Sequence, residues 1–272
     1  MDFRRDGFII RMFGITKGRV RITLFLISAV AISSTSTTKA FNDQKVCVRE
    51  YDVQRISNSN LKIPVKSKKI HFVRHAQGYH NVAGETDPIF GYLREDLEDA
   101  VLTDLGKEQC RNLASSLDVK FFKNINLIIV SPMRRTIETA IFSFPNQVKD
   151  KRITFLANEL IREQTGMHPC DRRRPITKQK TEFPRINFDK IVSDTDPIYK
   201  LYTFREPENV CAERGRKFIE YLFTLDEEEI VVVTHSAWLR HLFKYVLKTS
   251  DAVNDGRFNN CEMKSFIISE KK

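Results

Sequence analysis

Short, wholly apolar strand patterns alternate with helical patterns from about Val46 onward, and this alternation constrains the fold more than any other feature. Apolar runs of four to eight residues between polar segments are typical of buried strands. Such runs lie at 69–73, 127–130, 153–156, 230–234 and 264–269. Helical spacing of apolar residues occupies the intervals at 102–117, after Pro132, at 208–222 and at 236–247.

Strands that are apolar on both faces occur where helices cover both faces of a parallel sheet. The sequence therefore predicts an α/β fold, a three-layer sandwich with a mostly parallel central sheet covered by helices on both faces. No internal repeat and no long linker interrupts residues 46–272, so we assign them to one domain.

Residues 1–45 differ in composition and form a candidate targeting or signal segment with a linker. A basic stretch at 1–21 precedes an apolar run at 22–32, and small residues surround Ala40. The eleven residues of the apolar run would span about 16 Å as a helix, against a hydrocarbon core of about 30 Å, so no stable membrane span is expected. The pattern predicts a signal peptide and a protein of the secretory pathway or a secreted one. Plastid delivery by a signal-dependent route and a cytoplasmic location are the alternatives.

Charge and cysteine content narrow the expected partners. Half of the net charge of +10 lies in residues 1–46, which hold eight Lys or Arg and three Asp or Glu. The remaining chain is only slightly basic and has no nucleic-acid-binding motif, so no nucleic acid is expected as a partner. The five cysteines form no CxxC, and the sequence shows no carboxylate cluster or Gly-rich phosphate loop. Neither a metal nor a cofactor is therefore expected.

Polar residues follow three of the predicted strands, where ligands of open α/β sheets bind. The first strand is followed by Arg74 and His75, the second by a segment that includes Arg135, and the fourth by His235. Arginine guanidiniums match the geometry of phosphate oxygens, and a neutral histidine is a good nucleophile toward phosphorus. The sequence therefore predicts a crevice that processes phosphate groups without a metal.

The same residues resemble the motifs of the histidine phosphatase superfamily, in its phosphoglycerate mutase-like branch, over nearly all of residues 69–270. Arg74-His75 is similar to the family's Arg-His signature, and Asn81 stands at the spacing of its phosphate-binding Asn. Three further motifs match: Leu102-Thr-x-x-Gly106-x-x-Gln109, Ser131-Pro-Met-Arg-Arg135-x-x-x-Thr139-Ala140, and Thr234-His235-Ser236. The run from Arg74 to Asn81, together with Glu163-x-x-Gly166-x-His168, resembles a subgroup of plant, fungal and protist members.

The resemblance implies a metal-independent phosphomonoester hydrolase that works through a phosphohistidine. It assigns the attack on phosphorus to His75, the binding of phosphoryl oxygens to Arg74, Asn81 and Arg135, stabilisation of the transition state to a protonated His235, and proton transfer to Glu163. A phosphoglycerate mutase-type phosphotransferase is one alternative. A catalytically inactive phosphate-binding or interaction domain is the other.

The acid motif departs from the family pattern. The family has Leu-x-Glu-x-x-x-Gly, whereas Ile161-Arg-Glu163-Gln-Thr-Gly166 is one residue shorter. Glu159 and Asp171 are therefore alternatives to Glu163. Ala76 also replaces the usual Gly after the first histidine, a change that costs little because Ala is small.

Residues 164–206 form a candidate cap insertion. Their basic residues, Arg172 to Arg174 with Lys178 and Lys180, predict a positive rim that attracts a small anionic phosphorylated substrate. A solvated basic loop is the alternative. Hydrolysis is expected over mutase action, because only 37 residues follow His235 and a helix and a strand use most of them.

Overall fold

A computed structural model describes residues 51–55, 66–199, 201–249 and 256–270 of the chain. Residues 47–272 form a compact unit of their own. The segment 1–45, for which a targeting role is predicted, lies outside the described residues. Within the described ranges, no helix is both long enough and apolar enough to cross a membrane.

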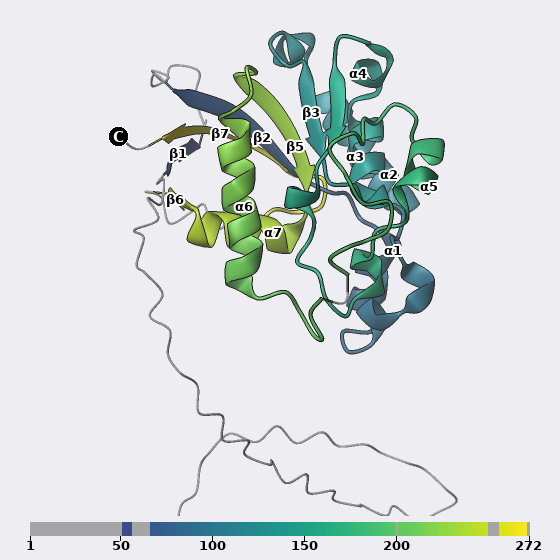
Figure 1. Cartoon of the computed structure of the whole chain (residues 1–272). Helices are drawn as coiled ribbons and strands as arrows, with labels where there is room; N and C mark the ends of the chain where they lie inside the picture. The colour runs from purple at the N-terminus through teal and green to yellow at the C-terminus, as the bar shows by residue number, and fades with distance from the viewer. Residues whose placement is uncertain (1–50, 56–65, 200, 250–255, 271–272) are drawn as a thin grey trace, which may run out of the picture. The chain divides into compact units, whose positions relative to one another are not determined.

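A seven-stranded sheet of order β4-β3-β5-β2-β7-β1-β6 forms the centre of this unit (Figure 1). Its strands are β1 (Tyr51–Arg55), β2 (Ser67–Arg74), β3 (Leu127–Val130), β4 (Thr154–Ala157), β5 (Glu229–Thr234), β6 (Leu247–Thr249) and β7 (Met263–Glu270). Neighbours are parallel from β4 through β3 and β5 to β2, whereas β7 runs antiparallel to both β2 and β1. The predicted mostly parallel sheet is confirmed. The sequence does not predict β1 or the edge strand β6, because neither is a wholly apolar run.

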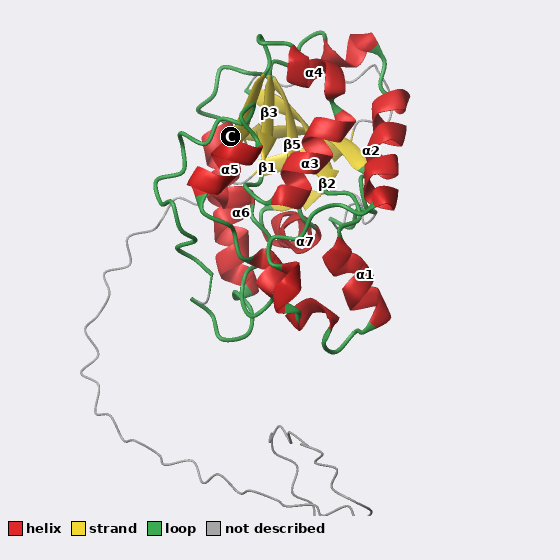
Figure 2. Cartoon of the chain, turned by 90° about the vertical axis from the view of Figure 1, so that its right-hand side faces the viewer, coloured by secondary structure: helices red, strands yellow, loops and turns green. Residues whose placement is uncertain are grey.

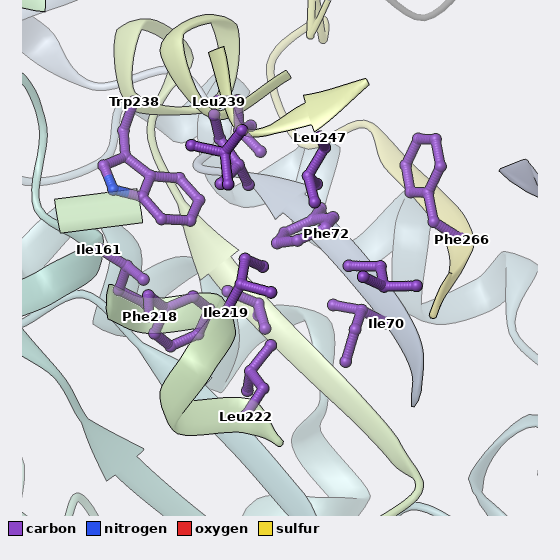
Figure 3. Packing of buried hydrophobic residues seen from close by; sticks show 14 of the residues in the cluster. Ile70, Phe72, Ile161, Phe218, Ile219, Leu222, Trp238, Leu239, Leu247 and Phe266 are labelled. Carbon is purple, nitrogen blue, oxygen red and sulfur yellow. The ribbon is translucent and has the colours of Figure 1, made fainter. Parts of the chain in front are cut away.

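Helices cover both faces of the sheet, which confirms the three-layer sandwich (Figures 1 and 2). On one face, α6 (Glu208–Leu222) and α7 (Ser236–Tyr245) pack their apolar residues, including Phe218 and Trp238, against Ile70 and Phe72 (Figure 3). On the other face lie α2 (Asp104–Ser116), α3 (Arg134–Ser143) and α5 (Ile176–Glu182). Because successive residues of a strand point to opposite faces, β5 must be apolar at every central position.

Shorter elements complete the described chain. They are α1 (Tyr79–Thr86), α4 (Pro145–Lys149) and the 3₁₀ turns η1 (Gly91–Leu93), η2 (Glu95–Leu97), η3 (Val119–Phe122), η4 (Glu159–Ile161) and η5 (Pro169–Asp171). The predicted helix at 102–117 begins at Asp104, because the Thr103 hydroxyl accepts a hydrogen bond from the Gly106 N–H and caps it. The predicted helix at 236–247 ends at Tyr245, since Leu247 already belongs to β6.

The register of the sheet brings the carboxyl ends of three strands to one level. Arg74 of β2 pairs with Thr234 of β5, and Val130 of β3 pairs with Val233. The residues that follow these pairs, His75, Ser131 and His235, therefore leave the sheet side by side.

Candidate active site

His75 and His235 meet at this edge of the sheet. The backbone N–H of His75 donates to the Thr234 carbonyl at 2.9 Å, and the two imidazole rings lie 5.2 Å apart between centroids. Both side chains are buried. The structure thus brings together the two histidines that the sequence places 160 positions apart.

His75 has the geometry of a nucleophile. Its Nδ1 lies 2.8 Å from the Ala76 carbonyl oxygen, an acceptor, so Nδ1 carries the proton and Nε2 keeps its lone pair. Burial lowers the pKa of His75 well below its usual value, and the charges of Arg135 and Arg74 lower it further. A neutral imidazole with a free Nε2 is the form that can attack phosphorus.

Two of the quoted motifs hold the backbone around His75. The Ala76 N–H donates to the Thr139 hydroxyl at 3.0 Å, and the Gln77 N–H donates to the Gln109 amide oxygen at 2.9 Å. The Thr139 hydroxyl in turn donates to the Arg135 carbonyl at 2.6 Å. A side chain at Gly106 would place its Cβ 2.1 Å from the Gln77 carbonyl oxygen, so only glycine lets α2 approach this loop. Gly106, Gln109 and Thr139 thus position the loop that carries His75 and do not line the cavity beside it.

Asn81 and His80 lie on the first turns of α1, beside His75. The Asn81 amide oxygen accepts a hydrogen bond from the Gly78 N–H at 3.0 Å, which leaves its NH₂ group for a ligand. His80 is buried, its ring lies 5.4 Å from that of His75, and its Nδ1 has no hydrogen-bond partner among the described residues. Burial, followed by the charge of Arg135, lowers the pKa of His80 well below its usual value.

Arg135, and not its neighbour, faces the site, as the motif spacing predicts. Its Nη1 donates to the Cys170 carbonyl at 2.6 Å and its Nη2 to Asp171 Oδ1 at 2.9 Å. Arg134 instead points outward and pairs with Glu182. Asp171 Oδ2 accepts a second hydrogen bond, at 2.8 Å, from Arg205. The carboxylate of Asp171 therefore orients two guanidinium groups.

Arg74 is fixed through only part of its guanidinium. Its Nη1 donates to the Phe258 carbonyl at 2.8 Å, whereas its buried Nε has no partner among the described residues. An unpartnered buried N–H costs free energy unless a ligand satisfies it. Arg74 can therefore donate hydrogen bonds to a bound anion.

His235 is expected from the sequence to be protonated, but its surroundings favour the neutral form. Its Nε2 lies 2.7 Å from the Ser131 hydroxyl, and its Nδ1 has no partner among the residues described. Burial, then the positive charge of Arg135, lowers its pKa well below the usual value. The site therefore holds His235 neutral, because burial and the charges of Arg135 and Arg162 oppose a further positive charge.

The three candidate carboxylates occupy different surroundings. Glu159 lies 2.6 Å from Arg173 Nε and 3.1 Å from Arg162 Nη1, away from the cavity. Asp171 borders the cavity, but Arg135 and Arg205 engage both its oxygens. Glu163 borders the cavity, and its hydrogen bonds with described residues all come from backbone N–H groups: that of Gln164 at 2.9 Å and those of the first turn of α7 at 2.9 and 3.2 Å.

A cavity of about 210 Å³ joins most of these groups, but neither His235 nor Glu159 is part of its lining. Its lining comprises Arg74, His75, His80, Asn81, Tyr92, Arg135, Glu163, His168, Cys170, Asp171, Arg205, Ser236, Ala237 and Arg240. Five of these lining residues, His80, Tyr92, His168, Arg205 and Arg240, are not among the site residues predicted from the sequence. His80 and His168 lie within quoted motifs, which is the signal that could have identified them. Tyr92 lies in η1 and Arg205 in an irregular segment, and neither follows a strand end or belongs to a motif.

The arginines of the candidate cap at 172–174 do not form the positive rim that the sequence predicts. Arg172 pairs with Glu98, and Arg174 pairs with Glu182. Arg173 is buried and donates to the carbonyl groups of residues 174 and 193–195. These arginines fasten irregular backbone and do not form the rim of the cavity. From segment 164–206 it is His168, Cys170, Asp171 and Arg205 that line the cavity.

Gly166 shapes the segment that follows the acid. Its φ of +150° disfavours other residues, and a Cβ there would lie 2.2 Å from the Phe204 carbonyl oxygen. This close approach lets Gly166 form a bridge with Arg205. Among the residues that the structure describes, no three His, Cys, Asp or Glu side chains are grouped so that they could hold a metal ion.

Comparisons with known proteins find related sequences. The family model described as the histidine phosphatase superfamily (branch 1) matches residues 70–272. The chain is 38% identical over 237 residues to a phosphoglycerate mutase-like protein of Arabidopsis thaliana, an overlap that covers 76% of this chain and 86% of that protein. It is 29% identical over 205 residues to a Schizosaccharomyces pombe protein named as a probable phosphatase, with 73% and 89% covered.

Solved structures show the same fold at low identity. A candidate alpha-ribazole-5'-P phosphatase from Escherichia coli superposes with a TM-score of 0.50 and 17% identity, over 75% of this chain and 94% of that one. This likeness concerns the fold alone.

Proposed function

The chain belongs to the histidine phosphatase superfamily, and from that premise we propose that it is a phosphomonoester hydrolase that forms a phosphohistidine on His75 without a metal ion. The family makes it an enzyme of the phosphatase or phosphoglycerate mutase-like kind. One observation carries the finer proposal. The buried His75 is neutral, its Nδ1–H is committed to the Ala76 carbonyl, and its Nε2 is free beside two guanidinium groups.

The first half-reaction transfers the phosphoryl group to the enzyme. His75 Nε2 attacks phosphorus in line; the N–P bond forms as the bond to the ester oxygen breaks. Arg74, Arg135 and the Asn81 NH₂ group bind the equatorial oxygens, as phosphoryl transfer depends on positioning and on charge stabilisation. The dianion also favours a proton on His235, because an opposite charge nearby raises a histidine pKa. The protonated His235 then stabilises the transition state.

Glu163 acts as the acid in this proposal. It gives its proton to the leaving alkoxide, and in the second half-reaction it takes a proton from the water that attacks phosphorus. This water breaks the N–P bond, releases inorganic phosphate and restores the neutral His75. The selection of Glu163 is supported by its place on the cavity and by the ion pairs that occupy Glu159 and Asp171.

Hydrolysis is favoured over mutase action by the exposure of the acid. Glu163 is partly exposed, whereas His75 is only 2% exposed. Water can therefore reach the leaving-group side of a phosphohistidine. A mutase needs the opposite arrangement, because its phosphoenzyme must be kept from water until the product has turned around. A small phosphorylated molecule suits the cavity of about 210 Å³.

The test is to trap the phosphoenzyme. The full chain is mixed briefly with a ³²P-labelled phosphomonoester and quenched in acid or in alkali. The proposal predicts label that survives only alkali, because a phosphoramidate on imidazole is labile in acid. His75→Ala abolishes label and turnover, whereas His241→Asn, which changes a histidine outside the cavity, retains both. Excess chelator leaves turnover unchanged.

Each contrary result has a definite meaning. Label that persists in His75→Ala, or turnover that chelator removes, overturns the mechanism. Transfer of label to a second hydroxyl of the substrate, in place of release as inorganic phosphate, favours the mutase. A folded protein that binds phosphate and turns over no phosphomonoester favours the inactive domain.

A further inference from the structure

Two buried cysteines meet beside the loop that carries His75. Cys110 lies on α2, and Cys261 lies in the turn that precedes β7. Their Sγ atoms are 3.9 Å apart, a close contact between two free thiols. Both cysteines belong to a small apolar cluster with Ala76 and Leu102. The fold therefore brings together, next to the nucleophile, two thiols that are 151 positions apart in the sequence.

The turn that contains Cys261 holds the backbone of the nucleophile. The Cys261 N–H donates to the carbonyl groups of Arg74 and His75, at 3.1 and 3.3 Å. The Asn260 amide also donates to the His75 carbonyl, at 3.2 Å. Cys261 has a φ of +59°, a left-handed conformation that costs free energy for a residue other than glycine. These hydrogen bonds help to maintain that conformation, so a movement of the turn also moves the loop.

Cys110 belongs to a part of the fold that is harder to move. It lies within α2, a helix of 13 residues, and follows Gln109, whose amide oxygen accepts from the Gln77 N–H. The same helix packs closely against the Gln77 carbonyl at Gly106. When the two sulfur atoms approach each other, we therefore expect Cys261 and its turn to move more than the helix.

The surroundings of the pair favour a thiolate on Cys261. A hydrogen bond with Cys110 lowers the pKa of the Cys261 thiol; burial opposes this, and the Ser143 hydroxyl, 3.7 Å from Cys261 Sγ, lowers the pKa further. The pKa of Cys110 is raised by its hydrogen bond with Cys261 and by burial. Cys261 is 6% exposed and Cys110 is 0% exposed. Cys261 is thus the sulfur that a small oxidant reaches first, and its thiolate is the reactive form.

We propose that Cys110 and Cys261 form a reversible disulfide when the protein meets a hydroperoxide, and that this bond slows phosphoryl transfer by His75. The effect on the rate rests on the proposed function, whereas formation of the bond does not. Cys261 is the sulfur attacked by the oxidant, and Cys110 is the resolving thiol.

The chemistry takes two steps. The Cys261 thiolate attacks one oxygen of the hydroperoxide; the O–O bond breaks, a sulfenic acid forms on Cys261, and the other oxygen leaves as an alcohol, or as water, after taking up a proton. The Cys110 sulfur then attacks the sulfenic sulfur, loses its proton and expels the hydroxyl group as water. Two thiols supply the two electrons that reduce one hydroperoxide. A dithiol reverses the oxidation by thiol–disulfide exchange.

The bond changes the geometry beside the nucleophile. A disulfide has an S–S distance of about 2.05 Å, so the two sulfur atoms must approach by about 1.9 Å. Movement of the Cys261 turn shifts the carbonyl groups of Arg74 and His75 that its N–H binds. A displacement of about 1 Å in a catalytic group can cost about 100-fold in rate. We expect kcat of the oxidised protein to be about tenfold lower or less than that of the reduced protein.

Peptide mapping of the full chain tests the bond directly. The reduced protein is treated with a slight excess of hydrogen peroxide, its remaining thiols are alkylated, and its proteolytic peptides are analysed by mass spectrometry without reduction. We expect a linked pair of peptides that contain Cys110 and Cys261. Dithiothreitol should remove the link and restore the rate. Absence of this link, or a link from either residue to Cys47, overturns the proposal.

Variants connect the bond with the rate. Each is measured as the ratio of its oxidised to its reduced kcat, so its own reduced form is the reference. Cys110→Ala and Cys261→Ser cannot form the bond and should keep this ratio near one. Cys211→Ala changes a buried cysteine of α6, is the matched control and should keep the wild-type ratio. Cys170→Ala should also keep it, although Cys170 lines the catalytic cavity.

The outcomes separate this inference from the proposed function. A rate loss that persists in Cys110→Ala, or disappears in Cys170→Ala, overturns the assignment to this pair. A linked protein with unchanged kcat overturns the effect on the rate, because the sulfurs then approach by side-chain rotation alone. If no phosphomonoester is hydrolysed, the proposed function fails, and peptide mapping still decides the bond. Calorimetric binding of inorganic phosphate to the two forms then replaces kcat, with equal affinities counting against the effect.

Discussion

The two sides of the catalytic cavity are built in different ways. The strand side consists of the residues that follow β2, β3 and β5. The backbone N–H groups of His75 and Ser131 donate to carbonyl groups of β5, and the Ser131 hydroxyl contacts the ring of His235. The cap side, residues 158–206, contains little regular structure. Buried arginines hold it together by donating to carbonyl groups and carboxylates, as Arg162 and Arg173 do. The proposed nucleophile, His75, is therefore held by the sheet. The proposed acid, Glu163, lies on a segment that ion pairs and side-chain hydrogen bonds hold in place.

This contrast explains the position of Glu163. Arg214 of α6 pairs with Glu206 through two hydrogen bonds at 2.7 and 2.8 Å. It also donates to the backbone carbonyls of residues 160, 162 and 163. The first turn of α7 then holds the Glu163 carboxylate. Glu163 is thus positioned mainly by the two helices α6 and α7, and its own segment adds the Gln164 N–H.

The largest expected effect concerns the acid on the cap side. Glu163→Gln slows hydrolysis of alkyl phosphates by about 100-fold or more, because general acid catalysis contributes at least that much. Aryl phosphates are slowed far less, since a good leaving group needs little protonation. Steady-state rates over a series of leaving groups measure the difference. If Glu159→Gln or Asp171→Asn shows this dependence instead, the acid lies elsewhere in the cap.

The second prediction tests the fastening of the cap. Arg173→Met leaves buried carbonyl groups and Glu159 without their cation, a loss that typically costs about 3–5 kcal/mol. Limited proteolysis should then cleave within 172–199, and KM should rise, while small substrates still label His75. Arg172→Met is the matched control; its side chain is 45% exposed, and the change should cost less than about 1 kcal/mol. Equal protease resistance in both variants would contradict the cap's dependence on Arg173.

The third prediction tests the frame of the strand side. Thr139→Val removes the acceptor of the buried Ala76 N–H, which costs about 1–3 kcal/mol and shifts the loop that carries His75. We expect kcat to fall about tenfold with little change in KM. Thr139→Ser keeps the hydroxyl and should retain most of the activity. A normal kcat in Thr139→Val would show that the strands alone position the nucleophile.

The smallest effect is a difference in acid sensitivity. Burial lowers the folded-state pKa of His75, His80 and His235 well below 6.5. Below about pH 6.5 the unfolded chain takes up protons that the folded chain does not, so stability falls as pH falls, by about 1 kcal/mol per histidine at pH 5.5. Urea unfolding between pH 7.5 and 5 measures this slope, and His80→Asn should flatten it.

A cap carboxylate provides the contrast over the same pH range. Burial opposes the charge of Asp196, but its hydrogen bonds with Arg162 outweigh burial and lower its pKa below 3.8. Its contribution to stability is therefore present above about pH 4 and is lost only at lower pH. Asp196→Asn should lower stability by the same amount at pH 7.5 and at pH 5. A slope that His80→Asn leaves unchanged and Asp196→Asn removes would reverse the comparison.

The strand side of the cavity could be predicted from the sequence, whereas most of the cap side could not. The wholly apolar strands identify themselves by composition, and the polar residues after them follow from the rule for open sheets, so Arg74, His75, Arg135 and His235 could be named in advance. Arg173 could not, because a charged residue in an irregular segment is usually solvated, and its burial depends on carbonyl groups some 20 positions away. Pairing at this distance leaves no periodic pattern in a sequence.

The sequence also does not identify which carboxylate of the cap side is the acid. Three carboxylates within thirteen positions fit the shortened motif about equally well. Their environments differ through contacts with Arg135, Arg173 and Arg205, which lie 14 to 36 positions away from the carboxylates they contact. Only the three-dimensional arrangement distinguishes a carboxylate held by guanidiniums from one held by backbone N–H groups.

The hydrogen bonds of Thr139 and Gln109 to the loop after His75 also bear on how loss of activity would look in a sequence. These residues support a backbone, and the fold needs them whether or not a phosphoryl group is ever transferred. A descendant that exchanged His75 for another residue would lose the reaction and could still keep both motifs intact. Matches to such supporting motifs therefore indicate a shared fold, whereas the histidines and arginines of the site indicate that the enzyme activity is kept.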